Sequence, residues 1–430
     1  MDSFRILGPN RLAGRVRASG AKNAALPALA ATLLTDRPVL LVGLPRVRDI
    51  RTMEQLLAHL GVGSEQRGEA LLLQPNHAAR PDEAPYELVK TMRASVLVLG
   101  PLLARRGHAR VSLPGGCAIG VRPIDQHLAG LEALGAQVEL EHGYVNATAA
   151  QLRGARFRFR APTVTGTENL MMAASLARGS TRLENCAREP EIEDLAALLS
   201  AMGARIDGAG SETIEIEGVP TLGGAEHQVI PDRIEGGTYL VGAALTGGDV
   251  TLAGARPAHL APLLEKLATC GATVEVAPDA IRVRREGELR PADVATAPHP
   301  GFPTDLQAQF MALMTQACGV SSLVETVFEN RYQHVPELNR MGADIRLAGG
   351  AATVHGPTPL SGATVMATDL RASACLVLAG LAATGETRVD RIYHLDRGYE
   401  AMESKLVALG ARVERLRAEP ATVTSGETTA

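Results

Sequence analysis

Apolar positions repeat along this chain with a long period. Six amphipathic helical patterns end in the same phrase, in which an apolar residue, a glycine and a small apolar residue follow one another. The six glycines are Gly61, Gly135, Gly203, Gly271, Gly342 and Gly410. Their spacing lies between 68 and 74 residues. A near-constant period of this length predicts six copies of one unit that holds several helices and strands.

The fourth unit shows the order of elements. An apolar helix is predicted over 235–245, and Gly247 and Gly248 end it. The pattern then predicts a strand over 250–252, an amphipathic helix over 260–267 and strands over 273–276 and 280–283. Each unit therefore reads strand–helix–strand–helix–strand–strand. The first helix is apolar nearly all round at 24–34, 170–176 and 375–381, which predicts that these helices are buried.

Length and composition narrow the class of protein. The 430 residues divide into two α/β domains of three units each. A formal charge of −4 argues against a nucleic-acid partner, and no apolar run is long enough to span a membrane. The five cysteines are scattered and the start of the chain has no signal-peptide pattern, so we expect a cytoplasmic protein without disulfides or a metal site. The polar tail from about 418 is expected to be disordered.

One cysteine lies in a glycine-rich loop. Cys117 stands among Gly115, Gly116 and Gly120, with the cation of Arg122 nearby. An exposed thiol beside a cation is where a reactive thiolate is expected. By residue type alone, however, most free cysteines are small buried hydrophobic residues.

Polar residues gather at two places in the repeating unit. The first is the start of the buried helix, where Lys22, Asn23, Arg93, Thr163, Val164, Asp305, Asp369 and Arg371 lie. The second is the loop after the second strand, with Cys117, Arg122, Phe328, Arg331 and Arg397. Helix N-termini and cations together favour an anionic ligand. Taken singly, an acidic residue at a helix start is usually an N-cap and a lone arginine is usually a solvated charge.

At these residues the chain resembles the UDP-N-acetylglucosamine enolpyruvyl transferase family, over about 6–411. The matching segments are 19–24, 91–95, the Cys117 loop through His127, 188–192, 231–235, 302–309, 326–331, 369–373 and 397–399. The segment 163–167 departs from the Ser-Val-Gly-Ala-Thr-like run of many members.

The resemblance implies an inside-out α/β barrel fold, with two similar domains of three βαβαββ units around buried helices. One domain would comprise 22–231 and carry the Cys117 loop as a lid. The other would comprise 1–21 and 232–430.

The resemblance also implies a reaction. The family transfers the enolpyruvyl group of phosphoenolpyruvate to the 3-hydroxyl of UDP-N-acetylglucosamine with release of phosphate, the first committed step of peptidoglycan synthesis, and is the target of fosfomycin. No cofactor or metal is implied. The implied catalytic residues are Cys117, Asp305, Lys22 and Arg397, with Cys117 as the acid and Asp305 as the base. The implied substrate contacts are Lys22, Asn23, Arg93, Arg122, Pro123, Ile124, Asp125, Gln126, His127, Thr163, Val164, Asp305, Val327, Phe328, Arg331, Asp369, Arg371 and Arg397.

Three other interpretations compete. The shikimate-phosphate enolpyruvyl transferases share the implied fold and donor but lack the cysteine loop. RNA terminal-phosphate cyclases would need a nucleotidylated-histidine motif, which we do not find. A non-catalytic repeat scaffold would explain the repeats, but not why it would place four residues together at loop tips, namely Lys22, Cys117, Asp305 and Arg397.

Overall fold

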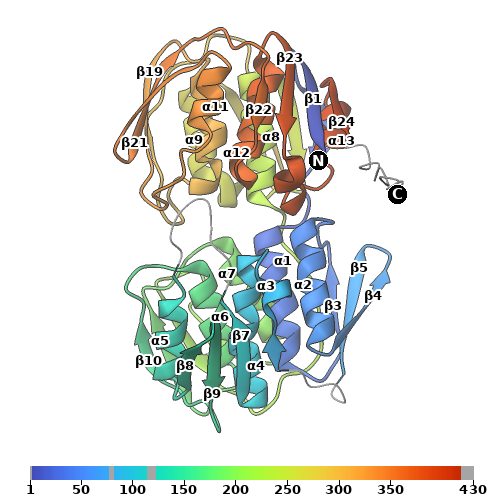
Figure 1. Cartoon of the computed structure of the whole chain (residues 1–430), viewed down its shortest axis with the longest axis vertical. Coiled ribbons are helices and arrows are strands. Elements are labelled where there is room, and N and C mark those ends of the chain that lie inside the picture. Colours follow the sequence, from blue (N-terminus) through green and yellow to red (C-terminus); the bar gives the residue numbers. More distant parts are fainter. Residues whose placement is uncertain (1, 77–81, 114–122, 418–430) are drawn as a thin grey trace, which may run out of the picture.

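The computed structural model describes residues 2–76, 82–113 and 123–417. The predictions made for Cys117, Arg122 and the tail from about 418 therefore lie outside the described residues. Figure 1 shows two lobes, one above the other. We call residues 21–230 the first lobe and residues 2–20 with 231–417 the second lobe.

Each lobe contains three four-stranded sheets. In the first lobe their strand orders are β14 (Ala225–Gln228), β3 (Val39–Val42), β5 (Ala70–Pro75), β4 (Val62–Arg67); β6 (Glu83–Ala84), β7 (His108–Ser112), β9 (Tyr144–Thr148), β8 (Gln137–Glu141); and β10 (Arg156–Arg158), β11 (Ser180–Glu184), β13 (Thr213–Glu217), β12 (Arg205–Asp207). In the second lobe they are β16 (Thr273–Ala277), β17 (Ala280–Arg284), β15 (Asp249–Ala253), β2 (Ala13–Arg17); β18 (Val294–Ala295), β19 (Gly319–Val324), β21 (Ala351–Gly356), β20 (Asp344–Ala348); and β22 (Thr364–Met366), β23 (Gly385–Asp390), β1 (Ser3–Gly8), β24 (Val413–Leu416). Every sheet has one parallel pair and two antiparallel pairs, so the repeat predicted from the sequence is present.

Each unit contributes two helices. The first set is α1 (Lys22–Ala31), α4 (Leu99–Arg106), α6 (Val164–Ala174), α8 (Arg233–Leu245), α10 (Gln307–Met314) and α12 (Leu370–Ala382). The second set is α2 (Arg48–His59), α5 (Asp125–Ala133), α7 (Pro190–Ala201), α9 (Ala261–Thr269), α11 (Val335–Arg340) and α13 (Met402–Ala408). Shorter pieces are α3 (Tyr86–Val89), η1 (Thr32–Leu34), η2 (Arg93–Val98), η3 (Pro257–Leu260), η4 (Thr304–Leu306) and η5 (Ile392–Arg397).

The first helices are buried, as their composition predicts. In α12 every residue from Arg371 to Leu381 is buried, and in α8 every residue from Ile234 to Leu245 is buried. The six repeat glycines all have positive φ, from 89° at Gly61 to 105° at Gly203. Glycine adopts this left-handed conformation at no steric cost, which explains why it ends the second helix of every unit.

The apolar residues form two separate cores. One runs from Ala21 to Ile230, and the other combines Phe4 to Val16 with Ile234 to Ala411. In Figure 1 the first lobe is blue to green, and the second lobe is yellow to red with the dark blue strand β1 among its red strands. The N-terminal strands therefore pack with the second half of the chain.

The chain crosses between the lobes at two adjacent points. Gly20 bridges Pro231, and the amide of Ala21 donates to the carbonyl of Ile230 at 2.7 Å. A side chain at Gly20 has no room, because a Cβ there would lie 1.8 Å from the carbonyl oxygen of Gly43.

The element order predicted for the fourth unit is present along the chain, but the crossings exchange one strand between the lobes. The strand before α8, β14, pairs with β3 in the first lobe, whereas β15 of the fourth unit pairs with β2. Hydrophobic periodicity reports the type of each element but not which distant strand completes its sheet.

Candidate active site

A buried carboxylate joins two of the predicted catalytic cations across the lobes. Asp49, in the first turn of α2, accepts from Nζ of Lys22 at 3.1 Å and from Nε of Arg397 at 2.9 Å. Lys22 and Asp49 belong to the first lobe, and Arg397 ends η5 of the second. Burial alone would raise the pKa of Asp49, yet the two cations outweigh it and hold this pKa below its usual value.

Sequence reasoning missed Asp49. Its position after Arg48 looks like an ordinary acidic residue in a helix first turn, a pattern that stabilises many helices. Asp49 differs from such residues in being buried, since only 4% of it is exposed.

Local structure explains why Lys22 lies at this point. The chain enters α1 directly from the crossing, and the backbone amide of Lys22 donates to Asp232, which is the N-cap of α8. One carboxylate thus contacts the N-termini of two buried helices, one from each lobe. Asn23 follows in the first turn of α1 and is partly buried.

A second carboxylate is held by two guanidinium groups. Asp305 lies in η4 and accepts from Nη2 of Arg331 at 2.7 Å on one oxygen and from Nη2 of Arg371 at 2.7 Å on the other. Burial would raise the pKa of Asp305, but the two arginines dominate and hold it far below the usual range.

Tyr399 connects the two carboxylate sites. The guanidinium carbon of Arg371 lies 5.6 Å from the centre of the Tyr399 ring, and Tyr399 follows Arg397 by two residues. The Tyr399 hydroxyl bonds Thr238 of α8 at 2.9 Å. Lys22, Arg397, Arg371 and Asp305 therefore belong to one contiguous region at the junction of the lobes.

Glu325 organises the loop that holds Val327 and Phe328. One of its oxygens accepts from the amides of Val327 at 2.8 Å and Phe328 at 3.1 Å. The other accepts from the hydroxyl of Thr304 at 2.9 Å, directly before Asp305. Glu325 fixes this loop relative to Asp305, and sequence reasoning missed it because its partners come from separate segments.

Asp369 has a clear structural task. Its side chain caps α12 by accepting from the amides of Arg371 at 2.8 Å and Ala372 at 3.1 Å. The cap fixes the backbone of Arg371 at the first turn of this buried helix.

The first lobe brings a second group of predicted contacts together. Nη2 of Arg93 donates to the carbonyl of Pro123 at 3.4 Å. The Gln126 amide bonds the backbone at both Arg160 and Ala161, close to where Thr163 caps α6 and Val164 begins it. Asp125 pairs with Arg160. Ile124, directly before α5, is buried.

The side chain of His127 lies beneath this group. It is 1% exposed, and its ring nitrogens contact Asn169 at 3.0 Å and Thr165 at 3.2 Å. Burial, with a smaller contribution from Arg93, lowers the pKa of His127 to about 3, so the ring is neutral at physiological pH. In this structure the His127 side chain supports the start of α6 from inside the lobe.

Further polar contacts link the lobes at α7. Nε of Arg233 donates to Glu191 at 3.2 Å, and the amide of His299 donates to Glu189 at 3.3 Å. Glu168 is buried against these acids, and burial followed by repulsion from Glu191 and Glu189 raises its pKa well above the usual value.

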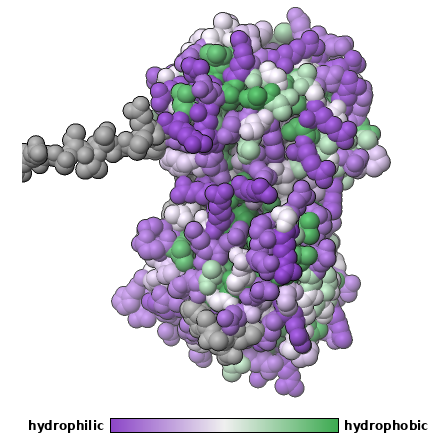
Figure 2. Space-filling view, turned by 90° about the vertical axis from the view of Figure 1, so that its right-hand side faces the viewer, coloured by the Kyte–Doolittle hydropathy of each residue, from purple (hydrophilic) through white to green (hydrophobic). Residues whose placement is uncertain are grey.

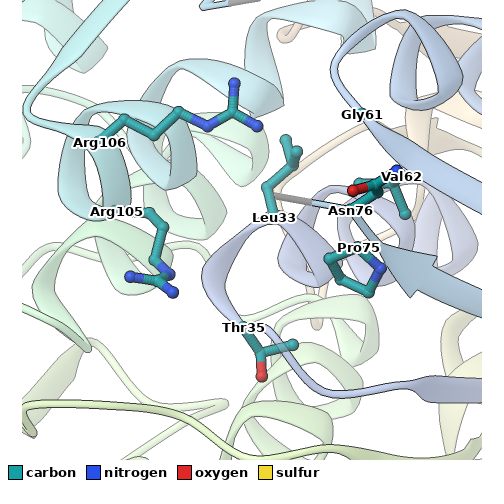
Figure 3. Close-up of a pocket in the computed structure, with 8 residues that line it drawn as sticks. All are labelled: Leu33, Thr35, Gly61, Val62, Pro75, Asn76, Arg105 and Arg106. Carbon is teal, nitrogen blue, oxygen red and sulfur yellow. The ribbon is translucent and has the colours of Figure 1, made fainter. Parts of the chain in front are cut away.

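The surface around the junction is polar. Figure 2 shows the molecule narrowing between the lobes, with hydrophilic residues on both sides of this waist. A small surface pocket of about 150 Å³, drawn in Figure 3, lies elsewhere in the first lobe between Leu33, Gly61, Pro75 and Arg106. No predicted site residue within the described part of the chain lines it.

Within the described ranges, no three His, Cys, Asp or Glu residues are grouped so that they could hold a metal ion. No helix of residues 2–76, 82–113 or 123–417 is both long and apolar enough to cross a membrane.

Comparisons with known proteins separate the interpretations that the sequence left open. The family model of EPSP synthase (3-phosphoshikimate 1-carboxyvinyltransferase) matches residues 6–406. A protein of Sorangium cellulosum (strain So ce56) is 60% identical over 418 residues, covering 97% of this chain and 99% of its own, and is named UDP-N-acetylglucosamine 1-carboxyvinyltransferase. A protein of Anaeromyxobacter sp. (strain Fw109-5) with the same name is 60% identical, covering 97% of this chain and all of its own.

The chain belongs to the UDP-N-acetylglucosamine 1-carboxyvinyltransferase family. The family resemblance read from the sequence is thereby confirmed, and its name favours the UDP-sugar enzyme over the shikimate-phosphate and scaffold alternatives.

Solved structures agree at the level of the fold. The enolpyruvyl transferase NikO from Streptomyces tendae superposes with a TM-score of 0.88 at 28% identity, covering 97% of this chain and 99% of its own. EPSP synthase from Acinetobacter baumannii gives a TM-score of 0.75 at 20% identity, covering 97% of this chain and all of its own. The family therefore has a mixed α/β enolpyruvyl transferase fold, as predicted.

Proposed function

We propose that this chain transfers the enolpyruvyl group of phosphoenolpyruvate to the 3-hydroxyl of UDP-N-acetylglucosamine and releases phosphate. One observation carries the proposal beyond the relatives' names: Lys22 and Arg397 come from different lobes and meet at one buried carboxylate, Asp49. Phosphoenolpyruvate places a phosphate and a carboxylate close together, and two cations on opposing lobes suit such a doubly anionic donor.

The addition step requires one proton to be removed from the sugar hydroxyl and one to be supplied to the donor. The hydroxyl oxygen of the sugar forms a bond to C2 of the donor, and its proton passes to Asp305. C3 of the donor takes a proton from Cys117, a role proposed from the sequence alone. The bond between C2 and the phosphate oxygen then breaks, and the leaving phosphate takes the proton from Asp305. C3 returns a proton to the Cys117 thiolate, which restores the double bond and regenerates the acid.

The remaining predicted residues divide between the two substrates. Lys22, Arg122 and Arg397 are proposed to provide the positive charge for the donor, with Arg93 and Arg371 alongside. The residues proposed to line the UDP-sugar site are Arg122, Pro123, Asp125, Thr163, Val164, Asp305 and Val327. Asn23, Ile124, Gln126, His127, Phe328, Arg331 and Asp369 are proposed as further substrate contacts.

We propose the inside-out α/β barrel as the finer description of the fold, and the two lobes as its domains. The buried α8 and α12 support the first proposal, and the two separate apolar cores support the second.

A phosphate-release assay tests the function. Phosphoenolpyruvate with UDP-N-acetylglucosamine should release phosphate, whereas phosphoenolpyruvate with shikimate 3-phosphate should not. Phosphate release from phosphoenolpyruvate with shikimate 3-phosphate, and none with UDP-N-acetylglucosamine, would contradict the proposal. Asp249→Asn is a matched control for acidic site variants, because Asp249 pairs with Arg282 on the surface of the second lobe.

A further inference from the structure

The contacts of Asp305 conflict with its proposed role as a base. Each of its carboxylate oxygens accepts a 2.7 Å hydrogen bond from a guanidinium group. The side chains of Arg331 and Arg371 are 3% and 6% exposed and that of Asp305 is 26% exposed, so water reaches these pairs only from the carboxylate side. Short charge-assisted bonds of this kind stabilise the carboxylate and disfavour its protonation. In this arrangement Asp305 is a weak proton acceptor.

An efficient general base has a pKa near the working pH. The arginines keep the pKa of Asp305 far below that range. Something in the catalytic cycle must therefore weaken at least one of the two pairs before the sugar hydroxyl can lose its proton to this carboxylate.

Arg371 is the partner with an unused donor. Its Nη1 is buried and forms no well-aligned hydrogen bond in the described structure, where the neighbouring hydroxyl is that of Tyr399. Leaving a buried charged donor unpaired is costly, which marks a position that an incoming anion can fill. The backbone of Arg371 is fixed by the Asp369 cap, so movement is confined to the side chain.

The other charged groups around Asp305 are less available to an incoming anion than Arg371. The guanidinium carbon of Arg331 lies 5.5 Å from the centre of the Phe328 ring, and its Nη2 is bonded to Asp305. Arg233 of α8 is already paired with Glu191 and acts on Asp305 only at longer range. Asp232 and Tyr399 face Arg371 from α8 and from the segment after η5. Arg371 is thus the group that an anion can most readily recruit.

We propose, building on the proposed function, that Arg371 is shared between Asp305 and the anionic donor, so that Asp305 becomes an effective base only after the donor has drawn Arg371 toward itself. The proton of the sugar hydroxyl then passes to Asp305 as the new carbon–oxygen bond forms. Without donor, Arg371 returns to Asp305, and this carboxylate is then too weak a base to activate water or the sugar.

The proposal predicts that donor binding carries a proton to Asp305 at mildly acidic pH. The probe is 2-phospholactate, which keeps the phosphate and carboxylate of the donor but has no double bond to react. It is titrated at pH 5.5 into protein saturated with UDP-N-acetylglucosamine, by isothermal calorimetry in buffers of different ionisation enthalpy. The wild type should take up about 0.3 proton or more per site beyond the Asp305→Asn variant, because linkage requires uptake when a pKa rises on binding. Subtracting the proton uptake of the Asp305→Asn variant removes the contribution of protons bound by the probe's own phosphate.

Two further variants sharpen the test. Arg282→Gln, which removes an arginine from a surface pair, should leave the extra uptake unchanged. Arg371→Gln should abolish it, because Asp305 then lacks this partner before and after binding. Arg371→Lys, which keeps the charge, should restore part of it. A merely structural role for Arg371 would not change the proton count of variants that still bind the probe.

The outcomes separate the two proposals. Equal proton uptake by the wild type and Asp305→Asn, in protein that binds 2-phospholactate and releases phosphate with the true substrates, overturns the sharing of Arg371 but not the function. Failure of the wild type to bind 2-phospholactate and to release phosphate overturns both.

Discussion

Replacing Asp49 by Asn tests the cation pair at the junction of the lobes. The substitution keeps the volume of the side chain and removes its charge. In the wild type this carboxylate holds Nζ of Lys22 at 3.1 Å and Nε of Arg397 at 2.9 Å. The free protein should lose stability, and at the same time the site should bind small anions more tightly.

The cost in stability follows from burial. The side chains of Lys22 and Asp49 are 12% and 5% exposed, whereas that of Arg397 is 35% exposed. The Lys22 pair therefore dominates, and breaking a buried ion pair typically costs about 3–5 kcal/mol. Because the amide of Asn still accepts one hydrogen bond, we expect a loss of about 3 kcal/mol and a fall in Tm of about 5 °C or more.

The gain in anion affinity comes from removing repulsion. An anion bound by the same two cations would lie roughly 6 Å from Asp49, and Coulomb's law at an effective dielectric constant of about 20 gives a repulsion of about 3 kcal/mol. Part of the gain from removing this repulsion is lost, because Lys22 and Arg397 no longer have the carboxylate that orients them. We expect inorganic phosphate and 2-phospholactate to bind at least about tenfold more tightly. Turnover should fall, since the cations are less well positioned for the transition state.

Thermal unfolding and isothermal titration calorimetry measure the two effects. Asp249→Asn, which breaks a surface pair with Arg282, should change neither Tm nor phosphate affinity appreciably. Unchanged stability of Asp49→Asn, or phosphate binding that is equal or weaker than in the wild type, would refute the idea that Asp49 competes with the donor for these cations.

Three further predictions concern other residues. A phosphonate epoxide should alkylate Cys117 before any other cysteine, since Cys186 and Cys270 are buried with pKa values raised by that burial to about 12 and about 11; peptide mass mapping that found Cys318 modified first would contradict this. Glu325→Gln should lower the free energy of unfolding by about 2 kcal/mol and raise KM for the UDP-sugar, because the side-chain amide cannot accept from Val327, Phe328 and Thr304 together. Glu325→Asp should restore neither quantity fully, and an unchanged KM would argue against this positioning role. Burial lowers the pKa of His127 in the folded protein to about 3, so on acidification the unfolded chain takes up this proton before the folded protein does. The wild type should therefore lose stability relative to His127→Asn as the pH falls from about 6.5 toward 3. Urea unfolding that gave the same difference in free energy of unfolding between the two proteins at pH 7 and at pH 5 would contradict this.

The repeating plan could be predicted because it is local. The helix ends at Gly61 and its five equivalents require a left-handed residue, and the apolar composition of helices such as α12 requires burial. Both requirements are visible in a short stretch of sequence. The partners of β14 and β2 could not be predicted in this way, since strand pairing over some 200 residues leaves no local pattern.

The candidate site was predicted in part for the same reason. Lys22, Asp305 and Arg397 are conspicuous because they are polar residues next to apolar helices or glycine turns. Asp49 and Glu325 have ordinary neighbours, and only the fold shows that each gathers partners from separate segments. The hydrogen bonds that hold Asp305 come from Arg331 and Arg371, which lie 26 and 66 residues further along the chain. No single sequence motif contains both partners.

The two adjacent crossings make the first lobe an insertion whose ends meet at Gly20 and Pro231. During synthesis, strands β1 and β2 leave the ribosome first, yet their partners β23, β24 and β15 are made only after the whole first lobe. The first lobe can therefore complete its core while those two strands wait unpaired, and the second lobe closes only when β24 arrives. The same arrangement marks where the gene could be cut: joining the chain across Gly20 and Pro231 would yield the second lobe as a continuous polypeptide, and the excised segment would carry both of its own ends at one point on its surface.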